Sequence, residues 1–111
     1  MQNRKESSVP AFTVKGCDRT EFNGKYFVDI SHNNGFRNGR QCYCKNGVGK
    51  NGSECKVWYF STGDYGLWMM TKSYGYDSYY QILSKAEQPP KAGWVVIKGS
   101  GTPPKLVFAV I

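Results

Sequence analysis

Five Asn-Gly dipeptides constrain the fold of this chain more than any other feature of its sequence. Asn and Gly adopt the positive backbone φ angles of two-residue hairpin turns, so each dipeptide predicts a tight reversal of the chain. The segments around these turns are rich in Tyr, Phe, Trp, Val and Ile, which favour a half-buried pleated surface. The sequence therefore predicts an antiparallel all-β domain. The dipeptides are Asn23-Gly24, Asn34-Gly35, Asn38-Gly39, Asn46-Gly47 and Asn51-Gly52.

Eight short strands are expected, because apolar residues either alternate with polar ones or form brief runs bounded by Gly and Pro. Their near-regular spacing predicts a single small antiparallel β-sandwich or barrel of about eight strands. The last two are nearly continuous apolar runs, which are typical of strands inside a stack of sheets. The expected strands are Ala11–Lys15, Tyr26–Ile30, Arg40–Lys45, Lys56–Ser61, Leu67–Lys72, Tyr79–Leu83, Trp94–Lys98 and Leu106–Val110.

The length and composition predict one domain. A chain of 111 residues that is 40% hydrophobic can bury one core but not two. Residues 1–8 contain no large apolar side chain after Met1, so we expect a disordered tail followed by a single β domain over residues 9–111. The sequence shows no signal peptide and no apolar stretch of membrane-spanning length, which favours a cytoplasmic protein without membrane insertion. An extracellular location would apply to an excised domain, and no oligomeric state is specified.

The four cysteines allow three interpretations. Cys42 and Cys44 should share one strand face next to Cys55, so with Cys17 or His32 they would form a tetrahedral zinc site. A single C-x-C pair is weak evidence for zinc, because zinc sites usually contain C-x-x-C knuckles. Two disulfides would suit a secreted protein. Reduced thiols packed as small hydrophobic groups are the favoured interpretation.

The sequence lacks the residue patterns that catalysis or cofactor binding requires. Its one histidine, His32, lies in an Asn-rich turn away from any nucleophile motif. The acidic residues are scattered singly, and the Gly-rich segment 47–52 lacks the spacing of a phosphate-binding loop. We therefore expect a non-enzymatic protein without a cofactor.

Tyrosines are concentrated in one short segment, which predicts a recognition surface. Tyr/Ser/Gly composition is typical of binding loops, where amphipathic rings supply contact area at a low entropy cost. We expect this segment, with the Tyr of the preceding turn, to recognise a protein or a glycan. The opposite expectation is that these rings complete the core. The candidate ligand-binding residues are Tyr65, Tyr74, Tyr76, Tyr79 and Tyr80.

The basic residues provide an alternative site. The net charge is +7, and five cations crowd the turn-rich middle, where Glu54 is the one opposing acid. Such a patch would bind single-stranded nucleic acid, although lysines at strand edges also simply discourage aggregation. The two functions differ in salt dependence, because only phosphate neutralisation weakens steeply with ionic strength. The patch would consist of Arg37, Arg40, Lys45, Lys50 and Lys56.

The order of several motifs resembles a small all-β module of multidomain proteins in protists and invertebrates. The motifs are Asn23-Gly24-Lys25-Tyr26, Asn38-Gly39-Arg40 with Tyr43, the segment Gly66-Leu67-Trp68-Met69-Met70, and a proline-led Gly93-Trp94. The resemblance spans about residues 14–110 and brings no assigned activity. It implies a scaffold in which Tyr26, Tyr43, Trp68 and Trp94 are structural.

Overall fold

The computed structural model describes residues 9–109, which form an all-β domain. The expected tail at residues 1–8 and the last expected strand residue, Val110, lie outside the described residues. The strands are β1 (Phe12–Lys15), β2 (Gly24–Val28), β3 (Phe36–Arg37), β4 (Arg40–Gln41), β5 (Tyr43–Lys45), β6 (Cys55–Ser61), β7 (Gly66–Lys72), β8 (Ser78–Leu83), β9 (Val95–Val96) and β10 (Lys105–Phe108). Two 3-10 turns, η1 (Thr20–Phe22) and η2 (Asn33–Gly35), connect early strands.

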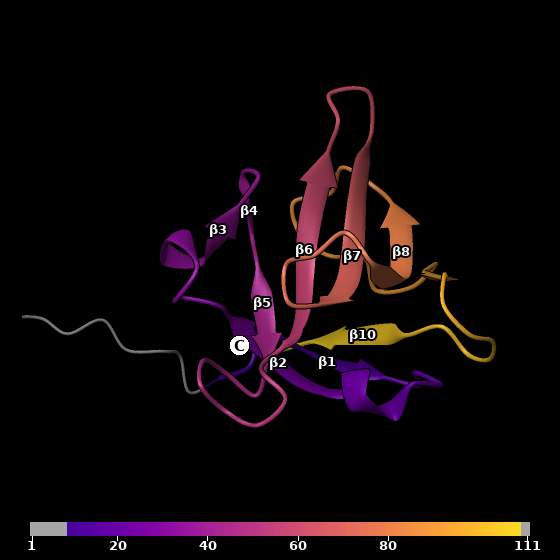
Figure 1. The fold of residues 1–111 in the computed structure, drawn as a ribbon, viewed down its shortest axis with the longest axis horizontal. Helices are drawn as coiled ribbons and strands as arrows, with labels where there is room; N and C mark the ends of the chain where they lie inside the picture. Colours follow the sequence, from indigo (N-terminus) through magenta and orange to yellow (C-terminus); the bar gives the residue numbers. More distant parts are fainter. Residues whose placement is uncertain (1–8, 110–111) are drawn as a thin grey trace, which may run out of the picture.

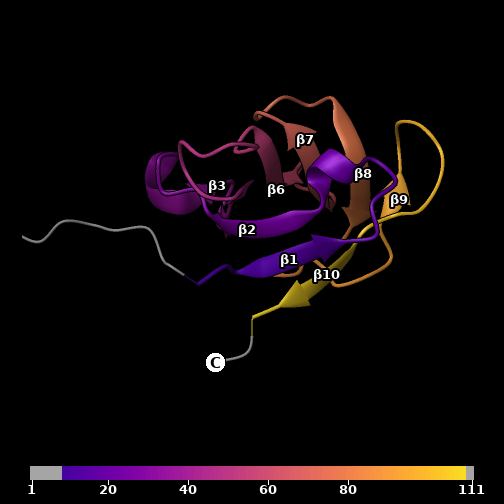
Figure 2. The same cartoon turned by 90° about the horizontal axis from the view of Figure 1, so that it is seen from below.

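Eight strands form one antiparallel sheet in the order β10-β1-β2-β5-β6-β7-β8-β9, and β3 pairs with β4 in a small hairpin. The sheet curls into a half-barrel, with β10, β1 and β2 lying beneath the long strands β6 and β7 (Figures 1 and 2). The predicted all-β class is therefore confirmed. The third expected strand is divided into β4 and β5 around Cys42.

Alternate residues of each strand point to the concave face and form the main core. In β6 these are Cys55, Val57 and Tyr59, and in β7 they are Trp68 and Met70. Aromatic rings fill much of this core, and their large buried area helps to bring the interior to close packing. The four residues expected to be structural, Tyr26, Tyr43, Trp68 and Trp94, are all buried.

The Asn-Gly dipeptides make different turns, so the expectation of five tight hairpins was too simple. Asn38-Gly39 joins β3 to β4 with positive φ at both residues (56° and 81°), as a two-residue hairpin turn requires. Asn34-Gly35 lies in η2, and at Asn23-Gly24 only the glycine has a positive φ. A shared dipeptide therefore marks a change of chain direction without fixing its type.

The last two strands are the edges of the sheet, so their expected place inside a stack was wrong. β9 and β10 occupy opposite ends of the strand order. Val95 in β9, Ile97 immediately after β9 and Val107 in β10 are each about half exposed. The continuous apolar runs of the last two strands indicated burial on both faces. In the structure only alternate residues, such as Val96 and Leu106, face the core, and their neighbours face solvent.

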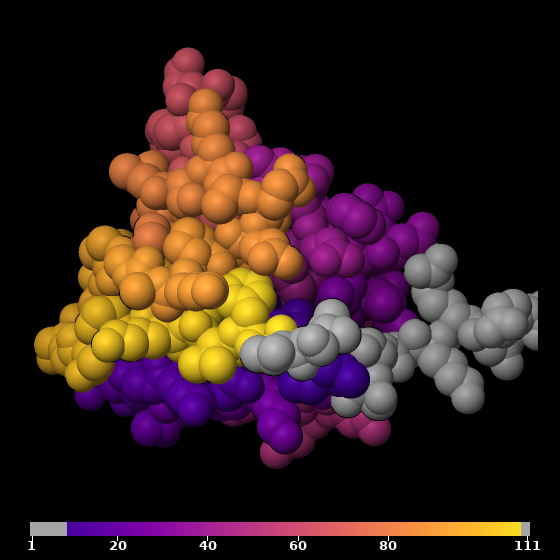
Figure 3. Space-filling model, turned by 180° about the vertical axis from the view of Figure 1, so that it is seen from behind, coloured from indigo at the N-terminus to yellow at the C-terminus, as the bar shows by residue number. Residues whose placement is uncertain are grey.

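A non-repetitive segment, residues 84–94, connects β8 to β9 and contacts β4, β7 and β10. Its carbonyl groups accept hydrogen bonds from Trp68 and Arg40, and the Lys91 carbonyl accepts one from the Leu106 backbone N–H. In the view from behind, its orange atoms meet the yellow atoms of β10 and the purple atoms of the β3–β4 region (Figure 3). Pro89 and Pro90 have no N–H to donate to a strand ladder, so the segment contacts its neighbours through its carbonyl groups.

Candidate functional site

The five candidate tyrosines differ widely in exposure. Tyr76 is 67% exposed and Tyr65 is 46% exposed, whereas Tyr74 and Tyr79 are half-buried. Tyr80 is 1% exposed, and its hydroxyl oxygen accepts a hydrogen bond from the Arg19 backbone N–H at 3.1 Å. The structure therefore removes Tyr80 from the expected recognition face, because its ring belongs to the core.

A β-bulge explains why two adjacent tyrosines face the core side. Met70 pairs with Tyr80 and Thr71 pairs with Ser78, so Tyr79 has no cross-strand partner in the register. Both rings then reach Phe22, at centroid distances of 5.1 Å for Tyr79 and 5.8 Å for Tyr80. Strict alternation would have turned one of the rings outward.

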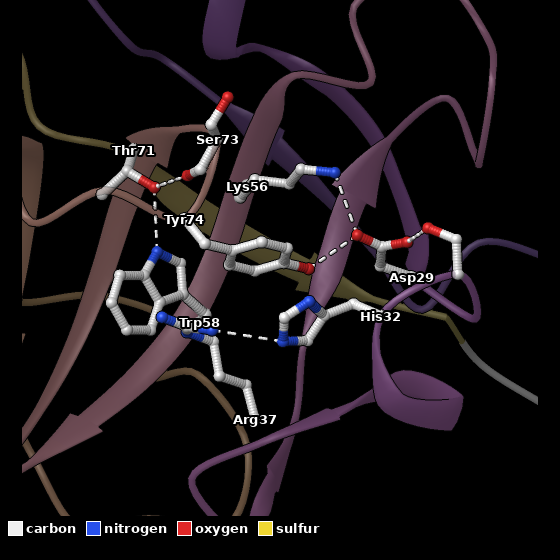
Figure 4. Close-up of polar contacts among 9 residues, drawn as sticks. Asp29, His32, Arg37, Lys56, Trp58, Thr71, Ser73 and Tyr74 are labelled. Atoms are coloured by element: carbon white, nitrogen blue, oxygen red, sulfur yellow. Dashed lines mark hydrogen bonds and ion pairs between the residues drawn. The ribbon is translucent and has the colours of Figure 1, made fainter.

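Tyr74 is the centre of a polar cluster on the outer face of the sheet (Figure 4). Its hydroxyl donates to Asp29 Oδ2 at 2.6 Å, Lys56 Nζ donates to the same oxygen at 2.9 Å, and Ser31 Oγ donates to Asp29 Oδ1 at 2.6 Å. Burial opposes ionisation of Asp29, but the hydrogen bonds from Ser31, Tyr74 and Lys56 outweigh it and lower its pKa. Burial and the bond to Asp29 raise the pKa of Tyr74. The ring of Tyr74 is thus fixed as part of the scaffold.

Arg37 covers the neighbouring Trp58 and contacts His32. The Arg37 guanidinium lies 4.5 Å from the Trp58 ring centroid and 4.9 Å from that of Tyr74. It also donates to His32 Nε2 at 3.2 Å, because a guanidinium has no acceptor. The His32 ring lies 4.2 Å from that of Tyr74. His32 is therefore a packing residue of this cluster and faces Arg37 and Tyr74 (Figure 4).

The loop after β7 folds back over the same face. Trp58 Nε1 donates to Thr71 Oγ1 at 2.8 Å, and the Thr71 hydroxyl donates to the Ser73 carbonyl. Ser73 has a positive φ of 59°, which reverses the chain. The loop then crosses in front of β6 and β7 (Figure 1) and places Tyr76 edge-on to Trp58, with a centroid distance of 5.8 Å.

An exposed apolar surface continues from Tyr76 across four strands, and the sequence reasoning missed it. Tyr76 lies 5.4 Å from Phe60, Phe60 pairs with Leu67, and Leu67 pairs with Leu83. One row further on, Gln81 pairs with Val95. We call this surface the Tyr76 face. It consists of four exposed residues, Tyr76, Leu83, Val95 and Ile97, and two partly buried ones, Phe60 and Leu67.

The Tyr76 face is open to solvent but has a rigid base. Leu83 is 70% exposed, Val95 56% and Ile97 47%. Beneath Tyr76, Trp58 and Met69 are buried in a second small cluster with Cys42. Alternation in β8 predicts that Leu83 lies on the face opposite Tyr80, so this signal was present in the sequence. The cross-strand register, which joins these residues into one surface, could not be read from the sequence.

The expected basic patch is largely engaged in internal contacts. Arg37 covers Trp58, Lys56 pairs with Asp29, and Lys45 Nζ donates to the Glu21 carbonyl at 2.7 Å. Arg40 donates to the carbonyls of residues 85 and 86, lies 3.8 Å from Glu87 and stacks 4.5 Å from the Tyr59 ring. Lys50 is exposed in the loop between β5 and β6. These cations stabilise loops and do not form one free patch.

The cysteines do not assemble a metal site. Cys42 packs in the second cluster, whereas Cys17 and Cys55 pack in the main core, so the expected convergence of three thiols was wrong. In residues 9–109 no three His, Cys, Asp or Glu side chains are grouped as metal ligands would be. All four cysteines are buried, and no disulfide joins any of them within residues 9–109. Burial raises the pKa of Cys17 to about 11, and it also raises the pKa of Cys42 and Cys55.

A hollow that includes none of the Tyr76 face residues lies between Phe36, Gln41, Phe108 and the segment 86–91. Its volume is about 650 Å³, and an adjoining hollow of about 410 Å³ shares Gln41, Gln88 and Phe108 with it. The size is that of a ligand pocket. Its charged lining residues are Glu87, which pairs with Arg40, and Lys91. This chemistry gives no specific indication of a ligand, so volume alone does not make it the favoured site.

Comparison of the chain with protein-family models, curated protein sequences and solved structures found no match. In residues 9–109 no helix has the length and apolar content needed to cross a bilayer. Inference about function therefore depends on the surface of the domain itself.

Proposed function

We propose that this protein is a non-catalytic recognition domain that binds a protein partner through the Tyr76 face. The observation that supports this most is a row of apolar side chains in which Tyr76, Leu83 and Val95 are exposed and the partly buried Phe60 and Leu67 lie between them. Monomeric proteins rarely expose such a patch unless it is a site of interaction.

The pre-formed base of the face favours binding. Trp58 and Met69 are buried under it, and Tyr74 and Arg37 hold the loop through Asp29 and Trp58. A surface that is already ordered loses little conformational entropy when a partner docks. Tyr76 is then the rigid aromatic anchor at one end, in the manner of interface hot spots.

A protein partner fits better than a glycan. Sugar binding depends on flat rings, whereas three exposed members of the face, Leu83, Val95 and Ile97, are aliphatic. Aliphatic side chains gain free energy chiefly by burial against apolar groups, which a protein supplies. Tyr65, in the β6–β7 turn, would lie at the rim of the contact.

The chemistry of the thiols supports a non-catalytic function. A nucleophilic cysteine needs a lowered pKa, and here burial raises the pKa of Cys17, Cys42 and Cys55. His32 faces Arg37 and Tyr74 instead of a thiol. The buried thiols, which form no disulfide within residues 9–109, also support the proposal of a reducing, cytoplasmic location.

Selection of peptides from a random phage library on the purified domain tests the proposal. Peptides that bind through the Tyr76 face should lose at least tenfold in affinity with Leu83→Ser or Val95→Thr. Val107→Thr is the matched control, because Val107 is a similarly exposed edge-strand valine (52%) on β10. Equal losses with Val95→Thr and Val107→Thr would refute the proposed surface. Binding on a glycan array that Leu83→Ser abolishes would show that the Tyr76 face binds a glycan and would refute the protein partner.

A further inference from the structure

A second feature, independent of the Tyr76 face, lies on the outer side of β10, β1 and β2. Phe12 and Val14 of β1 point into the core, so Thr13 and Lys15 point outward. Lys15 pairs directly with Lys105 of β10, and Thr13 pairs with Lys25 of β2. All three lysines are exposed, and Figure 2 shows the three strands side by side. We call this surface the lysine face.

Like charges directly opposite each other on paired strands destabilise a sheet. The Cβ atoms of such pairs are about 5 Å apart, and the diagonal from Lys15 to Lys25 is about 7–8 Å. The outward positions of the three strands hold Thr13, Phe27 and Val107 beside these lysines, and no acid. The nearest acid after β1, Asp18, lies beyond the strand beside Gly101.

The lysine face is not neutralised within residues 9–109. The ion pairs described there are Arg40–Glu87, Lys56–Asp29, Lys72–Glu21 and Lys98–Asp77, and none includes Lys15, Lys25 or Lys105. The chain as a whole has a net charge of +7. A concentrated positive surface on a rigid sheet attracts a ligand with closely spaced negative charges.

We propose that the lysine face binds the phosphate backbone of duplex nucleic acid without reading its sequence. Lysine acts as a point charge for phosphate, and three lysines whose Cβ atoms are about 5 Å and about 7–8 Å from the central one can neutralise neighbouring phosphates. No exposed aromatic ring accompanies them among the described outward positions, since Phe27 is half-buried. The face therefore has no platform for unstacked bases, which favours a duplex over a single strand.

The same observations argue against other anionic partners. Specific protein interfaces depend on exposed aromatic and arginine anchors, whereas the outward positions of β10, β1 and β2 hold no arginine and only the half-buried ring of Phe27. Membrane binding needs apolar insertion as well as charge, and Val107 is the one large exposed apolar side chain between these lysines. A phosphate backbone needs only the charges.

Fluorescence anisotropy of the full chain with a labelled DNA duplex of arbitrary sequence is the test. Neutralising three phosphates gives a slope of log K against log[salt] of about −2.7. The triple variant Lys15→Gln, Lys25→Gln, Lys105→Gln should bind at least tenfold more weakly and bring the slope close to zero. A control with the same loss of charge at exposed lysines elsewhere, Lys50→Gln, Lys85→Gln, Lys91→Gln, should keep most of the affinity and slope.

A charge reversal separates a binding role from a structural one. Lys15→Glu converts a repulsive cross-strand pair with Lys105 into an attractive one, so the melting temperature should rise while duplex binding is lost. Equal weakening in both triple variants would show that net charge alone matters and would overturn the proposal. So would tighter binding to a labelled single strand, or to vesicles of phosphatidylserine and phosphatidylcholine, than to the duplex.

Discussion

Asp29→Asn should destabilise the domain by about 2–3 kcal/mol at neutral pH. Asp29 is buried, with a side chain that is 1% exposed, and it accepts from Lys56, Tyr74 and Ser31. An asparagine in the same place can turn its carbonyl to Lys56 and Tyr74 and donate its N–H to Ser31. The shape of the side chain is kept, so the substitution removes only the negative charge that strengthens the hydrogen bonds from Lys56 and Tyr74. Hydrogen bonds to a charged group contribute roughly 1.5–3 kcal/mol each, and the weaker bonds to the amide oxygen offset part of the loss.

The pH dependence gives the sharper measurement. The pKa of Asp29 is lowered in the folded protein from its ordinary value of 3.8. Its charge therefore stabilises the fold above pH 3.8, and that stabilisation is lost as the pH falls through the lower, folded-state pKa. Urea unfolding of both proteins should show a gap in unfolding free energy that is full at pH 6 and shrinks below pH 4.

An exposed carboxylate provides the control for this experiment. Asp64→Asn, in the turn between β6 and β7, removes the same charge from an exposed residue and should change stability by less than about 0.5 kcal/mol. If the Asp29→Asn gap stayed constant down to the most acidic pH at which the protein folds, packing and not charge would explain the loss.

Three further variants test packing at single positions. Trp94→Ala truncates a buried ring and should lower the free energy of unfolding in urea by roughly 3–5 kcal/mol. Tyr76→Ala removes an exposed ring and should lower it by less than about 1 kcal/mol. Similar losses in the two variants would contradict the division between core and surface. Gly66→Ala would place a Cβ 2.1 Å from the Tyr59 hydroxyl and should destabilise by roughly 1–3 kcal/mol, unless the ring moves freely. Cys17, with a pKa of about 11, should react with iodoacetamide at pH 8 only after unfolding, and rapid labelling of the folded protein would contradict its burial.

The strands could be predicted from the sequence because each depends on local pattern. Alternation identified the core residues of β1 and β2, and the aromatic positions Tyr26 and Trp68 are buried as expected. Strand order could not be predicted in this way. Whether an apolar run becomes a central strand or an edge depends on pairing between distant segments, so β9 and β10 were misplaced.

The candidate site was only partly predictable, because exposure depends on register. Composition drew attention to the tyrosine segment, but one bulge buries Tyr80 and turns Tyr79 toward Phe22. The sequence suggested that the cations of the middle segment were free to bind a ligand. In the folded protein, backbone carbonyls and aromatic rings hold them. Conversely, Lys15 and Lys105 are ninety residues apart in sequence and meet only because β1 pairs with β10.

The pairing of the first strand with the last also determines how the domain responds to force. Ala109 N donates to the Ala11 carbonyl at 3.2 Å, and Phe12 pairs with Phe108, so the chain enters and leaves at one place. The ladder bonds of an antiparallel pair lie perpendicular to its strands. Tension on the two ends would therefore pull along these bonds and open them one after another, like a zipper, instead of loading them together in shear. When the chain is held at both ends, this domain would therefore unfold at low force and lengthen the chain.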